Sequence, residues 1–147
     1  MKRILLFAGT MILLIIQAAA QKSEIFVKDG AAIRGYDAVA YFTSGKPVKG
    51  SKEFSVNYKD ATWLFSSKQN AETFKANPEK YLPQYGGYCA YGLANGHKAT
   101  TEPDAWTILN GKLYLNYDKD IQQKWNKKQA DYIIAADKYW PTIKNKE

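Results

Sequence analysis

The segment AWTILNGKLYLNY, residues 105–117, constrains the fold of this chain more than any other stretch. Its central pair, Asn110-Gly111, tolerates the positive φ angles of a type I′ turn, and apolar residues flank it on both sides. We therefore predict an antiparallel β-hairpin over residues 105–117. A second alternating segment, KEFSVNYKDATWLFSS, reverses near Lys59 and Asp60, which predicts another hairpin over residues 53–66.

Helical signals surround these two hairpins. The segment SSKQNAETFKANPEKYLP begins with serine caps and contains Pro78, which predicts a helix over Ser67–Ala76. After the second hairpin, Asp118 is placed to cap one long helix or two consecutive helices, and Pro141 is expected to end them. We predict one small α+β domain with two antiparallel hairpins and several helices.

The amino end has the pattern of a secretory signal peptide. Lys2 and Arg3 precede the apolar run from Ile4 to Ile16, and small residues follow up to Ala20. The run is too short to span a membrane. We predict a signal peptide over residues 1–20 and cleavage near Ala20. The domain with its helical C-terminal extension would then occupy residues 21–147, in the periplasm or outside the cell, with no transmembrane segment.

Composition narrows the classes of function. The chain has 21 Lys and Arg against 14 Asp and Glu, a formal charge of +7, and its lysines are scattered. Scattered lysines are typical of a solvated surface, so we expect no nucleic-acid partner. Glycine-rich phosphate loops, supported carboxylate pairs and Cys-x-x-Cys motifs are absent from the sequence. These observations favour a binding protein over an enzyme.

Cys89, the only cysteine, lies in QYGGYCAYG. Gly86 and Gly87 allow a tight turn, after which Cys89 would lie in the first turn of a short helix. Free N–H groups there would lower the thiol pKa, and a partly open pocket would make the sulfur a nucleophile or metal ligand. The alternative is a buried, inert cysteine. Without a resolving cysteine, redox chemistry would need an external thiol.

Two further side chains are candidate metal ligands with Cys89. His97, the only histidine, would need a turn at Asn95-Gly96 to fold it back, and otherwise it is an exposed loop residue. Asp37 could bind a metal or simply cap a short helix. The glycines and nearby tyrosines form a candidate ligand pocket: Tyr36, Tyr85, Gly86, Gly87 and Tyr88.

The segment YKDATWLFSSKQNAETFKANPEKYLPQYGGYCA resembles the YHS domain family, and the motif PQYGGYCA is similar to a secreted branch of it. The resemblance implies a small α+β unit of a kind for which metal binding is the usual proposal. It also implies a chemically active chalcogen at Cys89, because some members of this branch carry selenocysteine, which we expect at this position.

The chain departs from the metal-associated YHS pattern at three positions. Where that pattern carries cysteines, this sequence has Ala40, Ser66 and Asn70. A thiolate-rich metal site is therefore not expected there. The resemblance instead favours a transition metal, copper first, or a small molecule bound around Cys89. Two alternatives stay open: redox chemistry with Cys89 as a low-pKa nucleophile, and an interaction module with a structural Cys89.

Overall fold

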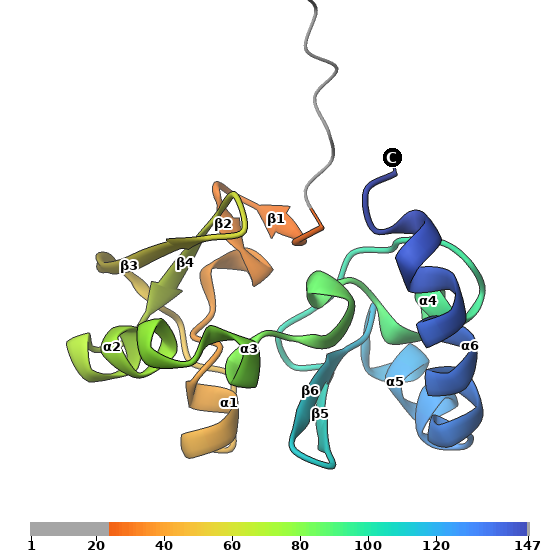
Figure 1. The fold of residues 1–147 in the computed structure, drawn as a ribbon. Coiled ribbons are helices and arrows are strands. Elements are labelled where there is room, and N and C mark those ends of the chain that lie inside the picture. The colour runs from red at the N-terminus through yellow and green to blue at the C-terminus, as the bar shows by residue number, and fades with distance from the viewer. Residues whose placement is uncertain (1–23, 147) are drawn as a thin grey trace, which may run out of the picture.

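A computed structural model describes residues 24–146, and the predicted signal peptide, residues 1–20, lies outside them. The described chain has an α+β fold with three two-stranded antiparallel sheets (Figure 1). The strands are β1 (Val27–Lys28), β2 (Ala31–Ala32), β3 (Ser51–Tyr58), β4 (Ala61–Phe65), β5 (Trp106–Leu109) and β6 (Lys112–Leu115). The helices are η1 (Ile33–Gly35), α1 (Ala40–Thr43), α2 (Lys68–Ala76), α3 (Pro78–Tyr81), η2 (Gln84–Gly87), α4 (Ala90–Ala94), α5 (Lys119–Asn126) and α6 (Gln129–Ile143).

Both predicted hairpins are confirmed. In the first, β3 pairs with β4, and the turn residues Lys59 and Asp60 both have positive φ. In the second, β5 pairs with β6, and φ is 51° at Asn110 and 73° at Gly111, as a type I′ turn requires. The short pair β1–β2 was not predicted, because each strand has only two residues.

The predicted helix starts are confirmed, and one predicted end is wrong. Ser67 Oγ accepts the Asn70 N–H at the start of α2, and Asp118 caps α5 through the Ile121 N–H. Pro141 lies inside α6 instead of ending it. Proline removes one helical hydrogen bond, that to the carbonyl of Asp137, and only the last residues of α6 follow it, up to Ile143.

Strand β6 lies between two parts of the core. Leu113 and Leu115 pack in the larger cluster with Phe65 and Phe74, whereas Tyr114 packs in the smaller cluster with Trp125. Alternate residues of a strand point to opposite faces, so this strand is buried on both sides. In Figure 1 it accordingly stands between the half that carries β1–β4 and the half that carries α4–α6.

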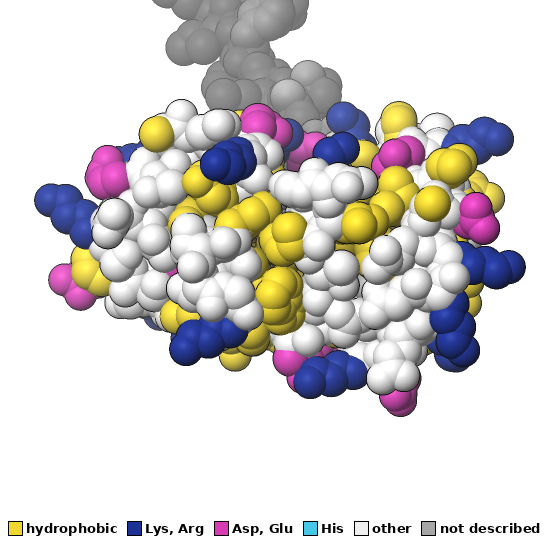
Figure 2. Space-filling model, turned by 90° about the horizontal axis from the view of Figure 1, so that it is seen from below, with side chains coloured by type: hydrophobic (Ala, Val, Ile, Leu, Met, Phe, Trp, Pro, Cys, Tyr) yellow, Lys and Arg dark blue, Asp and Glu magenta, His cyan; other side chains and the backbone are white. Residues whose placement is uncertain are grey.

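The side chains on the surface also differ between the middle of the molecule and its two ends. Seen from below in Figure 2, hydrophobic side chains gather along the middle of the molecule, between charged groups at both ends. On the opposite side, at the top of Figure 1, β1 and the C-terminal end of α6 approach one another. The candidate site lies in that upper region.

Candidate functional site

Cys89 lies where α4 meets the chain leaving β6. It is the N-cap residue of α4, one residue outside the predicted first turn, and η2 with Gly86 and Gly87 precedes it as expected. Its side chain is only 1% exposed. The prediction of a partly open pocket around the sulfur is therefore wrong, because the end of β6 covers it.

The sulfur takes part in hydrogen bonds from two segments. The N–H groups of Gly92 and Tyr117 donate to Sγ over 3.4 and 3.2 Å. Burial raises the pKa of the Cys89 thiol above its ordinary value, and these backbone donors offset only part of that effect. The expected low-pKa nucleophile is thus contradicted, since loss of solvation disfavours the thiolate more than the N–H groups favour it.

Asn116 is a buried partner of this thiol that the sequence did not reveal. The thiol donates to Asn116 Oδ1 over 3.5 Å, and the same oxygen accepts the Tyr91 N–H over 3.1 Å. The residue is fully buried, and its Nδ2 finds no hydrogen-bond partner among the described residues. The signal in the sequence was slight: one polar residue between Leu115 and Tyr117 at the end of a hydrophobic strand.

His97 is folded back toward the helix that Cys89 caps. Gly96 has a φ of 83°, a left-handed conformation that is common after the end of a helix and that makes the turn required at Asn95-Gly96. The His97 N–H then donates to Gly92 O over 3.1 Å, and a Cβ built on Gly92 would lie 3.5 Å from His97 Nε2. The His97 imidazole therefore lies beside Gly92, whose N–H donates to Cys89 Sγ. His97 is exposed, whereas Cys89 is buried.

A pocket of about 530 Å³ brings His97 together with Tyr88. It is lined by Phe26 and Val27, by Tyr88, by the loop of residues 96–100, and by Ile143 and Lys146. Burial raises the pKa of the Tyr88 hydroxyl. Sequence reasoning missed Phe26, Lys98 and Lys146 because the three segments that carry them are far apart along the chain.

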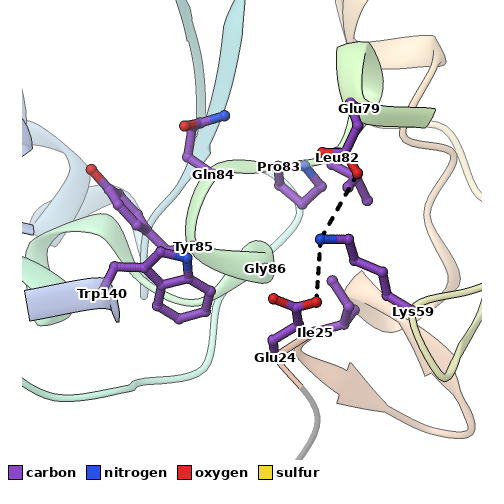
Figure 3. Close-up of a pocket in the computed structure, with 10 residues that line it drawn as sticks. All are labelled: Glu24, Ile25, Lys59, Glu79, Leu82, Pro83, Gln84, Tyr85, Gly86 and Trp140. Atoms are coloured by element: carbon purple, nitrogen blue, oxygen red, sulfur yellow. Dashed lines mark ion pairs between the residues drawn. The ribbon is translucent and has the colours of Figure 1, made fainter. Parts of the chain in front are cut away.

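The other predicted pocket residues do not share this cavity. Tyr85 and Gly86 line a smaller pocket of about 150 Å³, between η2, the β3–β4 turn and Trp140 (Figure 3). Gly86 must lack a side chain, since a Cβ there would overlap Glu24 O. Tyr36 lies under the Lys49 ammonium, 4.9 Å from its ring centroid. Gly87 packs against Ile33 and Pro83.

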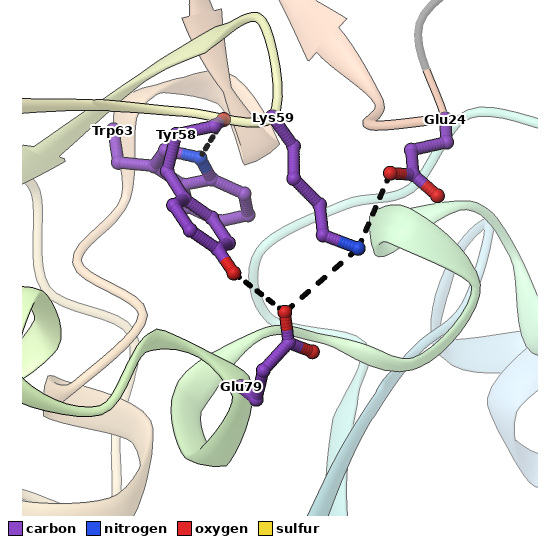
Figure 4. A network of polar contacts seen from close by, with 5 residues as sticks. All are labelled: Glu24, Tyr58, Lys59, Trp63 and Glu79. Carbon is purple, nitrogen blue, oxygen red and sulfur yellow. Dashed lines mark hydrogen bonds and ion pairs between the residues drawn. The ribbon is translucent and has the colours of Figure 1, made fainter.

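Ion pairs already occupy the polar side of the smaller pocket. Lys59 Nζ lies 3.2 Å from Glu24 Oε1 and 3.8 Å from Glu79 Oε1, and the Tyr58 hydroxyl donates to Glu79 over 2.6 Å (Figure 4). Partial burial acts against the charged Lys59, but its bond to Glu24 and the nearby carboxylates together raise its pKa. This cluster joins the amino-terminal segment to the β3–β4 turn and α3.

Asp37 lies in a separate buried network. Its Oδ1 accepts the Val39 and Ala40 N–H groups over 2.9 and 3.1 Å, at the start of α1, although the N-cap residue of that helix is Val39. Its Oδ2 accepts the Ser66 N–H, the Ser66 hydroxyl and Asn70 Nδ2 over 2.9, 2.6 and 2.8 Å. Five donors therefore use both carboxylate oxygens.

Neither a metal cluster nor a membrane-spanning helix is found in the part of the chain that the structure describes. Within residues 24–146, three or more His, Cys, Asp or Glu side chains never gather closely enough to hold a metal ion. Over the same residues, each helix is too short or too polar to cross a bilayer.

Comparison with known proteins supports the predicted resemblance over part of the chain. The model of the YHS domain family matches residues 39–85, which run from α1 to η2 and end before Cys89. No curated protein and no solved structure shows significant similarity to the chain.

The residues that donate hydrogen bonds to Asp37 lie within the matched segment, whereas Asp37 itself lies just before it. The three positions where the metal-associated YHS pattern carries cysteines are Ala40, Ser66 and Asn70, and all three donate to the carboxylate of Asp37. In this chain all three positions therefore contribute hydrogen bonds to one carboxylate.

Proposed function

We propose that this protein binds a small molecule in the pocket lined by Tyr88 and His97, beside Cys89. The observation that carries the proposal is the pocket itself. Its volume of about 530 Å³ falls in the usual range for small-molecule sites, and it contains two residues selected from the sequence as site candidates. The YHS match, over residues 39–85, is compatible with a binding role.

In this proposal Cys89 is a positioning residue. Its N–H donates to Ala99 O over 3.0 Å, and Ala99 is part of the pocket wall. Its Sγ accepts N–H groups from both α4 and the end of β6. Cys89 thereby fastens the loop of residues 96–100 to the core, while the neighbouring Tyr88 side chain faces the ligand.

A transition metal, copper first, is the second candidate ligand. The observation favouring it is that the exposed imidazole of His97 lines the pocket, where it would supply one nitrogen ligand while the bound molecule or water supplies the others. Paramagnetic broadening by Cu²⁺ of amide signals from residues 96–100, lost in His97→Gln, would support it. Broadening that persists in His97→Gln would exclude His97 as the ligand.

We further propose that the protein works outside the cytoplasm after cleavage near Ala20. The support is the sequence of residues 1–20, with its positive start, short apolar run and small residues. Mass spectrometry of the exported protein would measure its amino terminus. A chain that stays in the cytoplasm with Met1 or Lys2 at its start would refute this part of the proposal.

A fragment screen by NMR on the isotope-labelled protein tests small-molecule binding. Thr100 is exposed and lines the pocket, so Thr100→Trp should fill it. Gln123→Trp, on the exposed surface of α5, is the matched control. We expect amide shifts from bound fragments to centre on residues 26–27 and 96–100, to vanish in Thr100→Trp and to persist in Gln123→Trp. Shifts that centre elsewhere or survive Thr100→Trp would overturn the proposal.

A further inference from the structure

The chain contains two Asn-Gly pairs, Asn95-Gly96 and Asn110-Gly111, whereas every other asparagine precedes a residue that has a Cβ. In an Asn-Gly pair the glycine nitrogen can attack the side-chain amide carbon of the asparagine, because no Cβ crowds the approach. The attack needs a glycine N–H that can lose its proton, an asparagine side chain that can turn, and a backbone that can move. The two pairs differ in all three respects.

Asn110 and Gly111 meet these conditions at the tip of the β5–β6 hairpin. Both are exposed, and a Cβ built on Gly111 would meet no atom within 4 Å. Among the described residues, neither the Asn110 side chain nor the Gly111 N–H has a hydrogen-bond partner. The tip moves once the pair Leu109–Lys112 opens, and local opening of this kind at an exposed loop costs little free energy. The Gly111 nitrogen can then approach the Asn110 amide carbon.

Asn95 and Gly96 are held in place at the end of α4. Asn95 Nδ2 donates to Tyr91 O over 2.8 Å, and the Gly96 N–H donates to Leu93 O over 3.0 Å. A Cβ built on Gly96 would lie 3.3 Å from the Tyr139 ring, so a side chain of α6 packs against this turn. Both groups that would have to react are therefore hydrogen-bonded within the fold.

We propose that Asn110 is a site of spontaneous deamidation in the folded protein and that the fold protects Asn95. The Gly111 nitrogen forms a bond to Asn110 Cγ, the bond from Cγ to Nδ2 breaks, and ammonia leaves with the Gly111 proton. Water then opens the cyclic imide. Addition of water at Cγ gives aspartate, and addition at the main-chain carbonyl carbon gives isoaspartate, whose main chain runs through Cβ. Either product carries a negative charge that asparagine lacks.

This modification site goes beyond the proposed binding function and does not depend on it. Gly96 and His97 line the ligand pocket, so protection of Asn95 preserves the pocket wall, whereas Asn110 lies outside it. Isoaspartate at position 110 would add a carbon atom to the main chain of the β5–β6 turn. Because Leu113 and Leu115 of β6 are buried in the core, a changed turn should destabilise the hairpin and the fold.

Tryptic digestion separates the two pairs for measurement. Cleavage after lysines gives the peptides of residues 81–98 and 99–112, each of which contains a single asparagine. The folded protein is kept at mildly alkaline pH and then digested, and tandem mass spectrometry follows the replacement of NH₂ by OH in each peptide. We expect peptide 99–112 to be modified at least about tenfold faster than peptide 81–98, because two hydrogen bonds must break before Asn95 can react.

The reference is the same chain unfolded in guanidinium chloride, where both peptides should be modified at similar rates. Asn110→Gln would have to form a larger ring, so this variant should leave peptide 99–112 unmodified and peptide 81–98 unchanged. Equal rates in the folded protein would overturn the protection of Asn95. Modification of peptide 99–112 in the unfolded chain alone would overturn the native site, and no modification in either state would overturn both.

The isoaspartate form, separated from the parent by ion exchange, tests the effect on the hairpin. It should unfold at a lower urea concentration than the parent. Asn110→Asp is the matched control, because it has the same added charge on a normal main chain, and it should unfold close to the parent. Equal midpoints for the isoaspartate form and Asn110→Asp would refute the effect of the altered turn on the fold.

Discussion

The Asp37 network offers the most demanding test of the structure. In Asp37→Asn, one carboxylate oxygen becomes an NH₂ group of almost the same size, so packing is kept and hydrogen bonding changes. Oδ1 and Oδ2 together accept five hydrogen bonds from Val39, Ala40, Ser66 and Asn70. An amide has only one oxygen, so one side of this network must lose its acceptor.

The magnitude follows from the best arrangement open to the variant. The amide oxygen would keep the N–H groups of Val39 and Ala40, and the NH₂ group would face Ser66 and Asn70. The Ser66 hydroxyl can rotate to accept, and the Asn70 amide can flip to do the same, but the Ser66 N–H is left without an acceptor. Ser66 is exposed, so water can partly replace the lost acceptor, and the stranded N–H costs about 1 kcal/mol, at the low end of the range for buried groups. The remaining bonds lose their charge-assisted strength, and we expect a total loss of about 2 kcal/mol.

Urea unfolding at neutral pH measures this loss as a lower midpoint at an unchanged m-value. Glu53→Gln, an exposed carboxylate on β3, is the matched control and should change the free energy of unfolding by less than about 0.5 kcal/mol. If Asp37→Asn stays within about 1 kcal/mol of the native protein, the five hydrogen bonds do not hold α1, β4 and α2 together as argued.

Three further results are expected. Replacing Ala40, Ser66 and Asn70 together by cysteine should create a thiolate site beside Asp37, seen as Co²⁺ charge-transfer absorption that the native protein lacks; no such absorption would show that these positions do not converge. Iodoacetamide should leave Cys89 unlabelled until denaturant is added, because the side chain is 1% exposed; rapid native labelling would contradict the burial. Stability should fall with rising pH above about 8.5, since the unfolded thiol then loses a proton that the folded thiol, with its raised pKa, retains. Cys89→Ser should flatten that fall up to about pH 10, where buried tyrosines such as Tyr85 take over; an unchanged slope would show that Cys89 does not cause it.

The predicted parts of the fold are those with local causes. The Asn110-Gly111 turn and the alternation around it act within 13 residues, and Ser67 caps α2 through a neighbour three residues away. Such local sequence patterns favour the same hairpin or helix wherever the fold buries the apolar face of that element. The course of α6 past Pro141 was not predicted, because a proline is the local signal for a helix end, and here the helix continues to Ile143.

The candidate site depends on contacts between distant segments. Phe26, Tyr88, Lys98 and Lys146 share one pocket, although more than a hundred residues separate the first from the last. His97 was identified as the only histidine, with a turn at Asn95-Gly96 needed to fold it back, and the left-handed Gly96 makes that turn. The burial of Cys89 was not visible in QYGGYCAYG, since its cover comes from the end of β6.

The contacts of Cys89 indicate why a sulfur, with no second cysteine, is suited to this position. Two N–H groups from different segments reach Sγ at 3.2 and 3.4 Å, distances that suit sulfur better than a hydroxyl oxygen, whose hydrogen bonds are shorter. A thiol is also less costly to bury than a hydroxyl, because it behaves largely as a small apolar group. The same side chain can therefore fill a sealed space and still hold α4 to the end of β6. The Cys89 N–H also donates to Ala99 O, and Ala99 lines the neighbouring pocket. The contacts of Cys89 therefore fix the position of that pocket wall.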